Sequence, residues 1–121
     1  MELGAIEAVR VFTFDLARAR AFYCETLGLA ALSSGDGVVI LDTGQAKLLI
    51  EAADPDDAEE RPLVGRFMGI SFTVEDAQRS ADWLTGRGVA LEAPPERQAW
   101  GGVLVHFRDP DGNILTLVEY P

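Results

Sequence analysis

The sequence is short of several features, and each shortage excludes a class of protein. A single cysteine, Cys24, leaves no partner for an internal disulfide, which favours a reducing compartment such as the cytoplasm. No apolar run approaches the length of a membrane-spanning helix, and the N-terminus has no basic-then-apolar signal pattern. We therefore expect a cytoplasmic protein without a membrane partner.

Basic residues are also scarce. Lysine and arginine number 10 against 20 aspartates and glutamates, so the net charge is −10 at neutral pH. Phosphate backbones need a basic surface, so this balance argues against nucleic acid as a partner. Five of the acidic residues crowd between positions 54 and 60, a pattern typical of a solvated linker.

What the chain does contain is an internal repeat. The second half restates the first about 61 residues later, and a repeat of this length is a whole supersecondary unit. The clearest matches align segments 9–16, 27–30 and 44–51 with segments 70–77, 87–90 and 112–119.

The first half predicts one strand, one helix and three further strands. Residues 6–14 alternate as a strand does, and Asp15 is placed to cap a helix with an apolar stripe ending at Leu27. Gly28 follows where a left-handed helix cap is expected. Turn residues then separate strands expected at 29–33, 38–42 and 46–52.

The second half predicts the same order. A strand at 68–74 precedes a helix at 76–87, and strands follow near 89–92, 103–108 and 114–120, with an irregular piece at 93–102. The fold class is therefore α+β, with two tandem βαβββ units, curved mainly antiparallel sheets and outer helices. We expect one domain over 1–121, made of unit one at about 5–53, a linker at about 54–66 and unit two at about 67–121.

Several short motifs stand out along the chain: Asp15-Leu16, Phe22-Tyr23, Leu27-Gly28-Leu29, Trp100-Gly101 and Asp109-Pro110-Asp111-Gly112-Asn113. Together they resemble the motifs of the vicinal oxygen chelate superfamily. That superfamily includes glyoxalases, bleomycin-resistance proteins, fosfomycin-resistance transferases and extradiol dioxygenases. The resemblance covers nearly the whole chain, but one scaffold hosts many chemistries, so it is specific for the fold only.

The resemblance also implies where a divalent metal is held in enzymes of the superfamily. One ligand comes from the first strand and one from the last strand of each unit. Those positions correspond here to Ala8 and Leu48 in the first half and to Gly69 and Thr116 in the second. Three of the four have no donor side chain, and a lone hydroxyl binds divalent ions poorly, so we expect no metal and no other cofactor.

Two other residues remain open as metal or ligand contacts. Glu51 aligns with Glu119, and both lie an odd number of residues beyond the ligand positions on their strands. Their side chains are therefore expected on the face opposite those positions. A register error of one residue would return Glu51 to the cavity. His106, the only histidine, shares a strand face with Leu104 and Arg108. The lone histidine has no recognisable acid partner and no serine elbow is present, so we expect no catalytic residue.

The ligand-binding residues follow from strand parity and loop position. In the superfamily the strand face that carries the metal-ligand positions lines the cleft. Strand residues that share this face here are Arg10, Phe12, Ser71 and Thr116. Trp100 is added because its glycine-flanked loop offers no evident packing partner, and an aromatic ring stacks on flat ligands. The expected contacts are Arg10, Phe12, Glu51, Ser71, Trp100, His106 and Thr116.

These observations predict a small-molecule-binding protein of the bleomycin-resistance type. It would bind a drug or metabolite without metal, in an apolar groove at the interface of a homodimer, and an antibiotic so held is sequestered. One alternative is a metal-dependent lyase, isomerase or dioxygenase that uses Glu51 and His106 as unusual ligands. Another is an accessory module that senses a metabolite. The residues do not identify the ligand.

Overall fold

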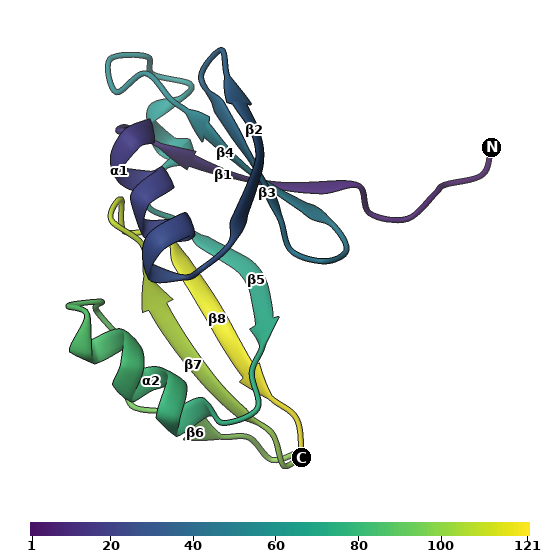
Figure 1. Cartoon of the computed structure of the whole chain (residues 1–121), viewed down its shortest axis with the longest axis vertical. Helices are drawn as coiled ribbons and strands as arrows, with labels where there is room; N and C mark the ends of the chain where they lie inside the picture. Colours follow the sequence, from purple (N-terminus) through teal and green to yellow (C-terminus); the bar gives the residue numbers. More distant parts are fainter. The chain divides into compact units, whose positions relative to one another are not determined.

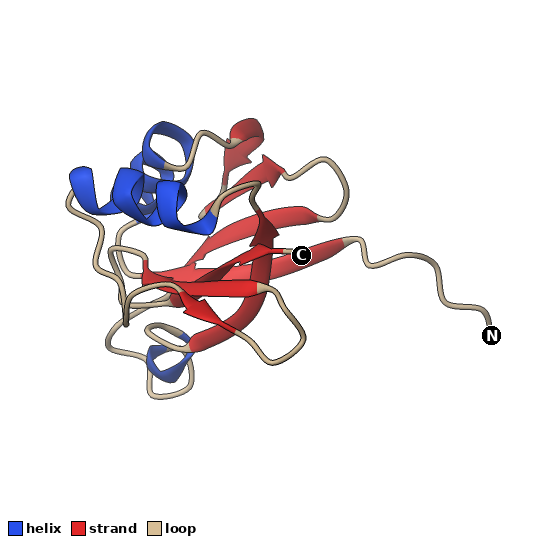
Figure 2. Cartoon of the chain, turned by 90° about the horizontal axis from the view of Figure 1, so that it is seen from below, coloured by secondary structure: helices blue, strands red, loops and turns tan.

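The computed structural model describes residues 1–121, which divide into two compact units, Met1–Val64 and Gly65–Pro121. Each unit contains one four-stranded sheet with a helix packed on one of its faces (Figures 1 and 2). The two units are described separately below.

The first unit has a mixed sheet with the strand order β1-β4-β3-β2. The first strand runs parallel to β4, whereas the β3–β4 and β2–β3 pairs are antiparallel. The helix α1 packs on β3 and β4. In chain order the elements are β1 (Ala8–Thr13), α1 (Leu16–Ala21), a π-helical turn (Phe22–Thr26), β2 (Ala30–Gly35), β3 (Val38–Asp42), β4 (Lys47–Ala52) and a 3₁₀ turn (Arg61–Leu63).

The second unit repeats this topology with the order β5-β8-β7-β6. Again the first and last strands are parallel and the remaining pairs are antiparallel. The helix α2 packs on β7 and β8. The predicted pair of βαβββ units is therefore confirmed. The elements are β5 (Phe67–Thr73), α2 (Ala77–Gly86), β6 (Glu96–Arg97), β7 (Val103–Arg108) and β8 (Ile114–Glu119).

Matching aspartates begin both helices, as the sequence predicts. The side chain of Asp15 accepts a hydrogen bond from the Arg18 backbone N–H at 3.0 Å. Asp76 accepts one from Arg79 at the same distance. Each aspartate thereby satisfies a backbone donor that has no partner within its helix.

The first helix differs from the expected regular helix reaching Leu27. Its regular part ends at Ala21, and Phe22–Thr26 continues as a π-helical turn in which the Leu27 N–H donates to the Phe22 carbonyl at 2.9 Å. A π turn has more residues per turn, so adjacent side chains diverge less. The adjacent rings of Phe22 and Tyr23 are accordingly both buried, edge to face, with centroids 5.2 Å apart.

One expected strand of the second unit is wrong. Residues 89–92 form only an isolated bridge, in which Leu91 pairs with Phe107. The outer strand is instead the two-residue β6, which lies inside the segment 93–102 that we expected to be irregular. Pro94 and Pro95 precede β6, and proline cannot donate to a sheet ladder, so pairing starts only after them.

Alternation along the strands gives each sheet two different faces. The helix-facing face carries the hydrophobic core, and we call the opposite one the helix-free face. In the first unit the core strand residues are Val11, Val39, Leu41, Leu48 and Ile50, all no more than 2% exposed. Their counterparts in the second unit are Val105, Phe107, Leu115 and Leu117.

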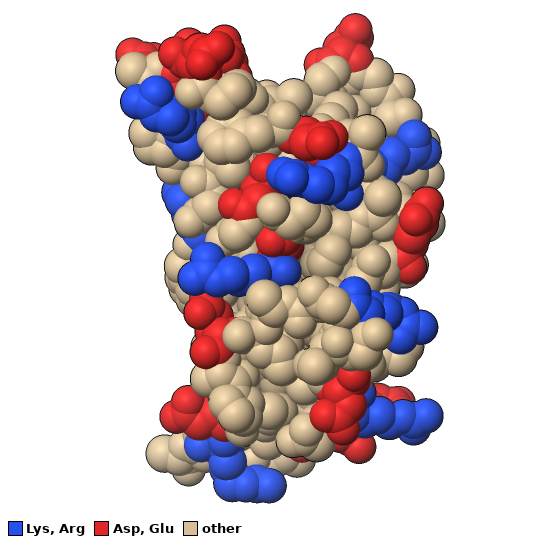
Figure 3. All heavy atoms as spheres, turned by 90° about the vertical axis from the view of Figure 1, so that its left-hand side faces the viewer, with Lys and Arg blue, Asp and Glu red and all other residues tan.

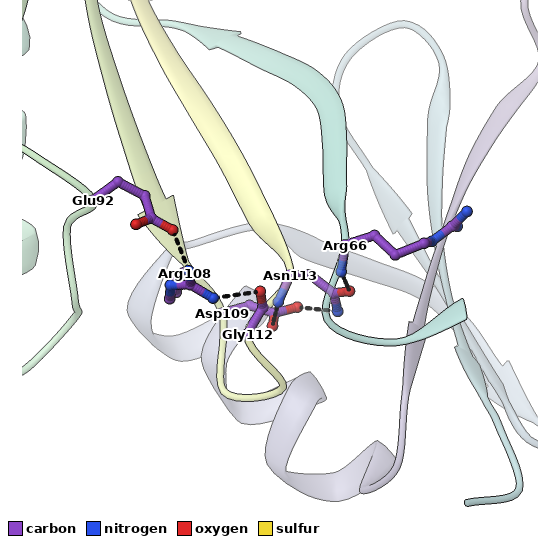
Figure 4. Close-up of polar contacts among 6 residues, drawn as sticks. All are labelled: Arg66, Glu92, Arg108, Asp109, Gly112 and Asn113. Atoms are coloured by element: carbon purple, nitrogen blue, oxygen red, sulfur yellow. Dashed lines mark hydrogen bonds and ion pairs between the residues drawn. The ribbon is translucent and has the colours of Figure 1, made fainter. Parts of the chain in front are cut away.

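The turn between β7 and β8 is held by two buried polar side chains (Figure 4). One carboxylate oxygen of Asp109 accepts hydrogen bonds from the backbone N–H groups of Asp111 and Asn113, each at 2.9 Å. The other accepts from the Asn113 side-chain amide, also at 2.9 Å. The Asn113 amide oxygen in turn accepts from the backbone of Gly65 at 2.8 Å and of Arg66 at 3.3 Å. The turn is thereby joined to the segment that enters β5.

A neighbouring arginine closes the outside of the same turn (Figure 4). Arg108 donates to the Gly112 carbonyl at 3.2 Å and forms an ion pair with Glu92 at 2.6 Å. The Asp-Pro-Asp-Gly-Asn motif, which carries much of the family resemblance, is thus accounted for by structure.

Charged side chains of both signs are interspersed over the face of the molecule drawn in Figure 3. The acidic segment at 54–60, inside the first unit, contains two turns built by its own aspartates. Asp54 accepts from the Asp56 N–H at 2.9 Å, and Asp57 accepts from the Glu59 N–H at 2.8 Å.

No helix of the chain has the length and apolar character needed to cross a bilayer.

Candidate functional site

In the second unit a row of three polar side chains crosses the helix-free face. Ser71 on β5 is paired with Thr116 on β8, and Thr116 is paired with His106 on β7. Residues directly opposite one another on adjacent strands have their side chains on the same face. Three residues of the predicted ligand site are therefore brought together by register alone.

The central contact of this row joins His106 to Thr116. The His106 Nδ1 and the Thr116 Oγ1 lie 2.8 Å apart. Thr116 is only 3% exposed, whereas His106 is half-buried and Ser71 is exposed. The threonine hydroxyl thus orients the imidazole, and the second ring nitrogen, Nε2, takes no part in this hydrogen bond.

An aromatic residue that the sequence analysis missed borders this row. The Phe67 ring meets the His106 ring edge-on, with centroids 5.9 Å apart, and Phe67 is 63% exposed. The expected strand began at Met68, one residue too late to include it. In the sequence, Phe67 is marked only by its place directly before the expected strand. Its exposure, which suggests a contact surface, is seen in the structure alone.

In the first unit the helix-free face carries an ion pair. The Nε and Nη2 groups of Arg10 lie 2.9 and 2.8 Å from the same Glu51 carboxylate oxygen. This hydrogen bond and the negative charge of Glu51 raise the pKa of Arg10 above its ordinary value. The Arg10 guanidinium carbon also lies over the Phe12 ring, 5.3 Å from its centroid. Arg10, Phe12 and Glu51 are thus brought together.

The position of Glu51 corrects the sequence alignment of the last strands. Glu51 is paired with Phe12, on the same face as Arg10, and not on the opposite face as first expected. The cause is the turn before each strand: Gly44-Gln45-Ala46 precedes β4, but only Gly112-Asn113 precedes β8. The register error of one residue that was left open is therefore real.

The same shift changes two other assignments. Leu49, not Leu48, is the counterpart of Thr116, because Leu49 is paired with Arg10 as Thr116 is paired with Ser71. Glu119 is not equivalent to Glu51. Its carboxylate accepts a hydrogen bond at 2.8 Å from the backbone N–H of Ala77, the first residue of α2. Glu119 therefore serves the helix-facing side of its sheet.

Trp100 lies away from the strand faces, in the hairpin loop between β6 and β7. Its ring lies 5.8 Å from that of Tyr120 by centroid and packs over Gly102, where a Cβ atom would collide with it. The ring therefore has packing partners, contrary to the reason for which we selected it. It is still 52% exposed. The expectation that it lines one cleft with Phe12, Arg10, Ser71 and Thr116 stays a prediction.

The residues at the superfamily's metal positions do not fit a divalent ion. With the corrected register they are Ala8, Leu49, Gly69 and Thr116, of which only Thr116 has a donor, and that hydroxyl is bonded to His106. Elsewhere in the chain no three histidine, cysteine, aspartate or glutamate side chains come together as a metal site. Divalent ions of this kind need several nitrogen, sulfur or carboxylate donors. We therefore derive no chemistry through a metal.

Two βαβββ units, each with a helix on one face of its sheet and exposed or half-buried side chains on the other, define a protein of the glyoxalase fold. Residues 5–117 match the family described as the Glyoxalase/Bleomycin resistance protein/Dioxygenase superfamily. The match covers nearly the whole chain, and the protein belongs to this superfamily.

Individual relatives agree with this assignment. The chain is 29% identical to the uncharacterized protein YraH of Bacillus subtilis (strain 168), over 92% of this chain and 94% of YraH. A superfamily member from Sphaerobacter thermophilus DSM 20745 has a crystal structure with a TM-score of 0.82, 28% identity and 98% coverage of both chains. TnmS3, an antibiotic binding protein from Streptomyces sp. CB03234, gives a TM-score of 0.79 at 25% identity and covers 100% of this chain and 99% of its own.

Proposed function

We propose that the protein binds a small organic molecule without a metal ion and acts by sequestering it, with an antibiotic as the leading kind of ligand. The observation that carries this proposal is the donor-poor set Ala8, Leu49, Gly69 and Thr116. A scaffold that lacks metal donors at those positions still presents sheet faces on which a small molecule can bind.

The two helix-free faces offer different interactions to such a ligand. The first unit presents Phe12 and the paired Arg10 and Glu51, which suit an aromatic or apolar body. The second presents Ser71 and His106, which suit hydroxyl or carbonyl groups. Thr116 contributes by holding His106. The first face therefore favours an aromatic group of the ligand, and the second favours an uncharged polar group.

The likeness to TnmS3 supports the binding of an antibiotic. That protein is described as antibiotic binding, and its chain aligns with this one over nearly its full length. In this proposal the protein works as a homodimer with a small molecule as its only other partner. Sequestration then requires tight binding and no turnover.

The test is a thermal-unfolding screen of antibiotics and, separately, of divalent ions. A ligand that binds only the native state stabilises it by RT ln(1 + [L]/Kd), about 2.7 kcal/mol at one hundred times Kd. We expect at least one aromatic antibiotic to raise the midpoint while Zn²⁺, Ni²⁺, Mn²⁺ and Fe²⁺ do not. A hit should be weakened by Ser71→Ala and by His106→Gln, and unchanged in the control Gln78→Ala, which alters an exposed residue of α2.

Elemental analysis of protein purified without chelator provides the decisive contrast. We expect no stoichiometric metal. About one tightly held ion per chain would refute metal-independent binding and favour an enzyme of the superfamily instead. An antibiotic that is recovered chemically altered after incubation would refute sequestration even if it binds.

A further inference from the structure

We infer that Arg10, which is held between Glu51 and Phe12, is a stacking platform for a flat aromatic ligand. The ligand itself need not carry a negative charge. This inference rests on the proposed function and narrows its ligand to a chemical class. A free arginine on a binding face would predict an anionic ligand. The contacts of Arg10 predict a different one.

The contacts with Glu51 and Phe12 leave much of the Arg10 side chain exposed. Glu51 occupies the edge of the planar group, where Nε and Nη2 point at one carboxylate oxygen. Phe12 lies beneath the group, with its ring centroid 5.3 Å from the guanidinium carbon. The Arg10 side chain is nevertheless 61% exposed. An aromatic ring stacked on the outer face would complete a layered arrangement of Phe12, Arg10 and ligand.

The charge balance points away from an anionic ligand. Glu51 compensates the charge of the guanidinium, so the pair is neutral as a whole. An anion at this place would gain attraction from Arg10 and repulsion from Glu51. A neutral ring loses nothing to Glu51, because stacking uses the face of the guanidinium and not its edge.

The surroundings of Arg10 on this face are apolar. Leu49 is its direct neighbour on β4, Ile40 follows on β3, and Ala8 precedes it on β1. All three are half-buried, so each still exposes part of its side chain. A flat molecule that extends beyond the guanidinium would cover apolar surface.

The repeat shows that the fold does not need these three residues. The corresponding positions in the second unit are Ser71, Thr73 and Val118, which are paired in the same register. That sheet has the same strand order without any ion pair there. The arrangement in the first unit is therefore an addition to the fold, which favours a binding role.

The experiment uses two fluorescent probes with one aromatic skeleton. N-phenyl-1-naphthylamine is neutral, and 8-anilinonaphthalene-1-sulfonate adds a sulfonate. We expect the wild-type chain to bind the neutral probe and Arg10→Lys to weaken it about threefold to tenfold, because lysine keeps the charge and loses the plane. Glu51→Gln should weaken the neutral probe but strengthen the sulfonate, since Arg10 is then uncompensated.

The matched control is Arg87→Lys on α2. Arg87 also lies over an aromatic ring, with its guanidinium carbon 3.4 Å from the Trp83 centroid, but outside the helix-free faces. It should leave both probes unchanged. Arg10→Gln serves as a second variant, and the thermal midpoint of each variant shows whether it is folded.

Several results would overturn the platform. One is unchanged binding of the neutral probe in Arg10→Lys and Arg10→Gln. Another is weakening of the sulfonate probe alone, which would show charge pairing in place of stacking. Failure of the wild type to bind the neutral probe also refutes it. The proposed function is judged separately, since the antibiotic screen can succeed with a ligand that does not stack on Arg10.

Discussion

Replacing Asn113 by alanine should destabilise the second unit more than its position in a turn motif would suggest. The side chain is fully buried and joins the β7–β8 turn to the start of β5. Its amide donates to the Asp109 carboxylate at 2.9 Å, and its oxygen accepts from Gly65 at 2.8 Å and, more weakly, from Arg66 at 3.3 Å. All three bonds are lost at once in Asn113→Ala.

The magnitude follows from the type of each bond. A hydrogen bond to a charged group contributes about 1.5–3 kcal/mol and a neutral one about 1 kcal/mol, and the long bond to Arg66 contributes less. We therefore expect the free energy of unfolding to fall by about 3 kcal/mol. For a chain of this size the thermal midpoint should fall by roughly 10 °C.

Tryptophan fluorescence during urea unfolding is a suitable assay. Both tryptophans, Trp83 and Trp100, lie in the second unit, so the signal reports the unit that is perturbed. The control is Gln98→Ala, which removes an exposed side-chain amide bonded to the Glu96 carbonyl at 3.0 Å. That change should cost less than about 0.5 kcal/mol. A loss below about 1 kcal/mol for Asn113→Ala would refute the reasoning.

Three further predictions concern the ligand, the assembly and the surface charges. Trp100→Ala should weaken binding of the ligand found in the antibiotic screen several-fold and leave the fold intact, because a stacked ring contributes on the order of 1 kcal/mol beyond its buried area. If the variant unfolds, or if its oligomeric state changes while its ligand affinity does not, Trp100 is a packing residue. Sedimentation at micromolar concentration should give about twice the chain mass of 13.1 kDa, and a monomer that persists at high concentration would contradict the homodimer. Glu7 and Lys47 form an exposed ion pair 2.6 Å apart, which lowers the pKa of Glu7 and raises the pKa of Lys47. The small stabilisation from this pair should be present at neutral pH and disappear as the pH falls through the lowered pKa of Glu7. The midpoint difference between wild type and Lys47→Met should therefore vanish in acid and in high salt, and a difference that persists there would have another cause.

The fold was predictable where the signals are local. Asp15 and Asp76 mark the helix starts because a capping side chain acts within its own turn. The core positions were predictable because alternation needs only neighbouring residues. The β6 strand was not, since two residues after two prolines carry no periodicity, and the strand exists only through its pairing with Val103 and Leu104 of β7.

The candidate site was predictable in part for the same reason. Arg10, Phe12, Ser71 and Thr116 share the expected faces because parity within a strand is local. Glu51 was placed on the wrong face because register between strands depends on the length of the preceding turn, which the repeat does not conserve. Contacts between side chains far apart in sequence, such as the ring pair of Trp100 and Tyr120, leave no mark in a single sequence.

The separation of the two sheet faces has a consequence for how such a protein changes over time. In both halves the residues toward the helix are large and apolar, whereas Arg10, Leu49 and Ile40 on the other face of the first are replaced by Ser71, Thr116 and His106 in the second. Mutations on the helix-free faces alter the exposed surface without disturbing the packing that keeps the chain folded. Under the proposed function, binding preference is thereby free to drift at nearly constant stability. A scaffold with this property can serve one chemical after another, as the varied activities named in its superfamily suggest.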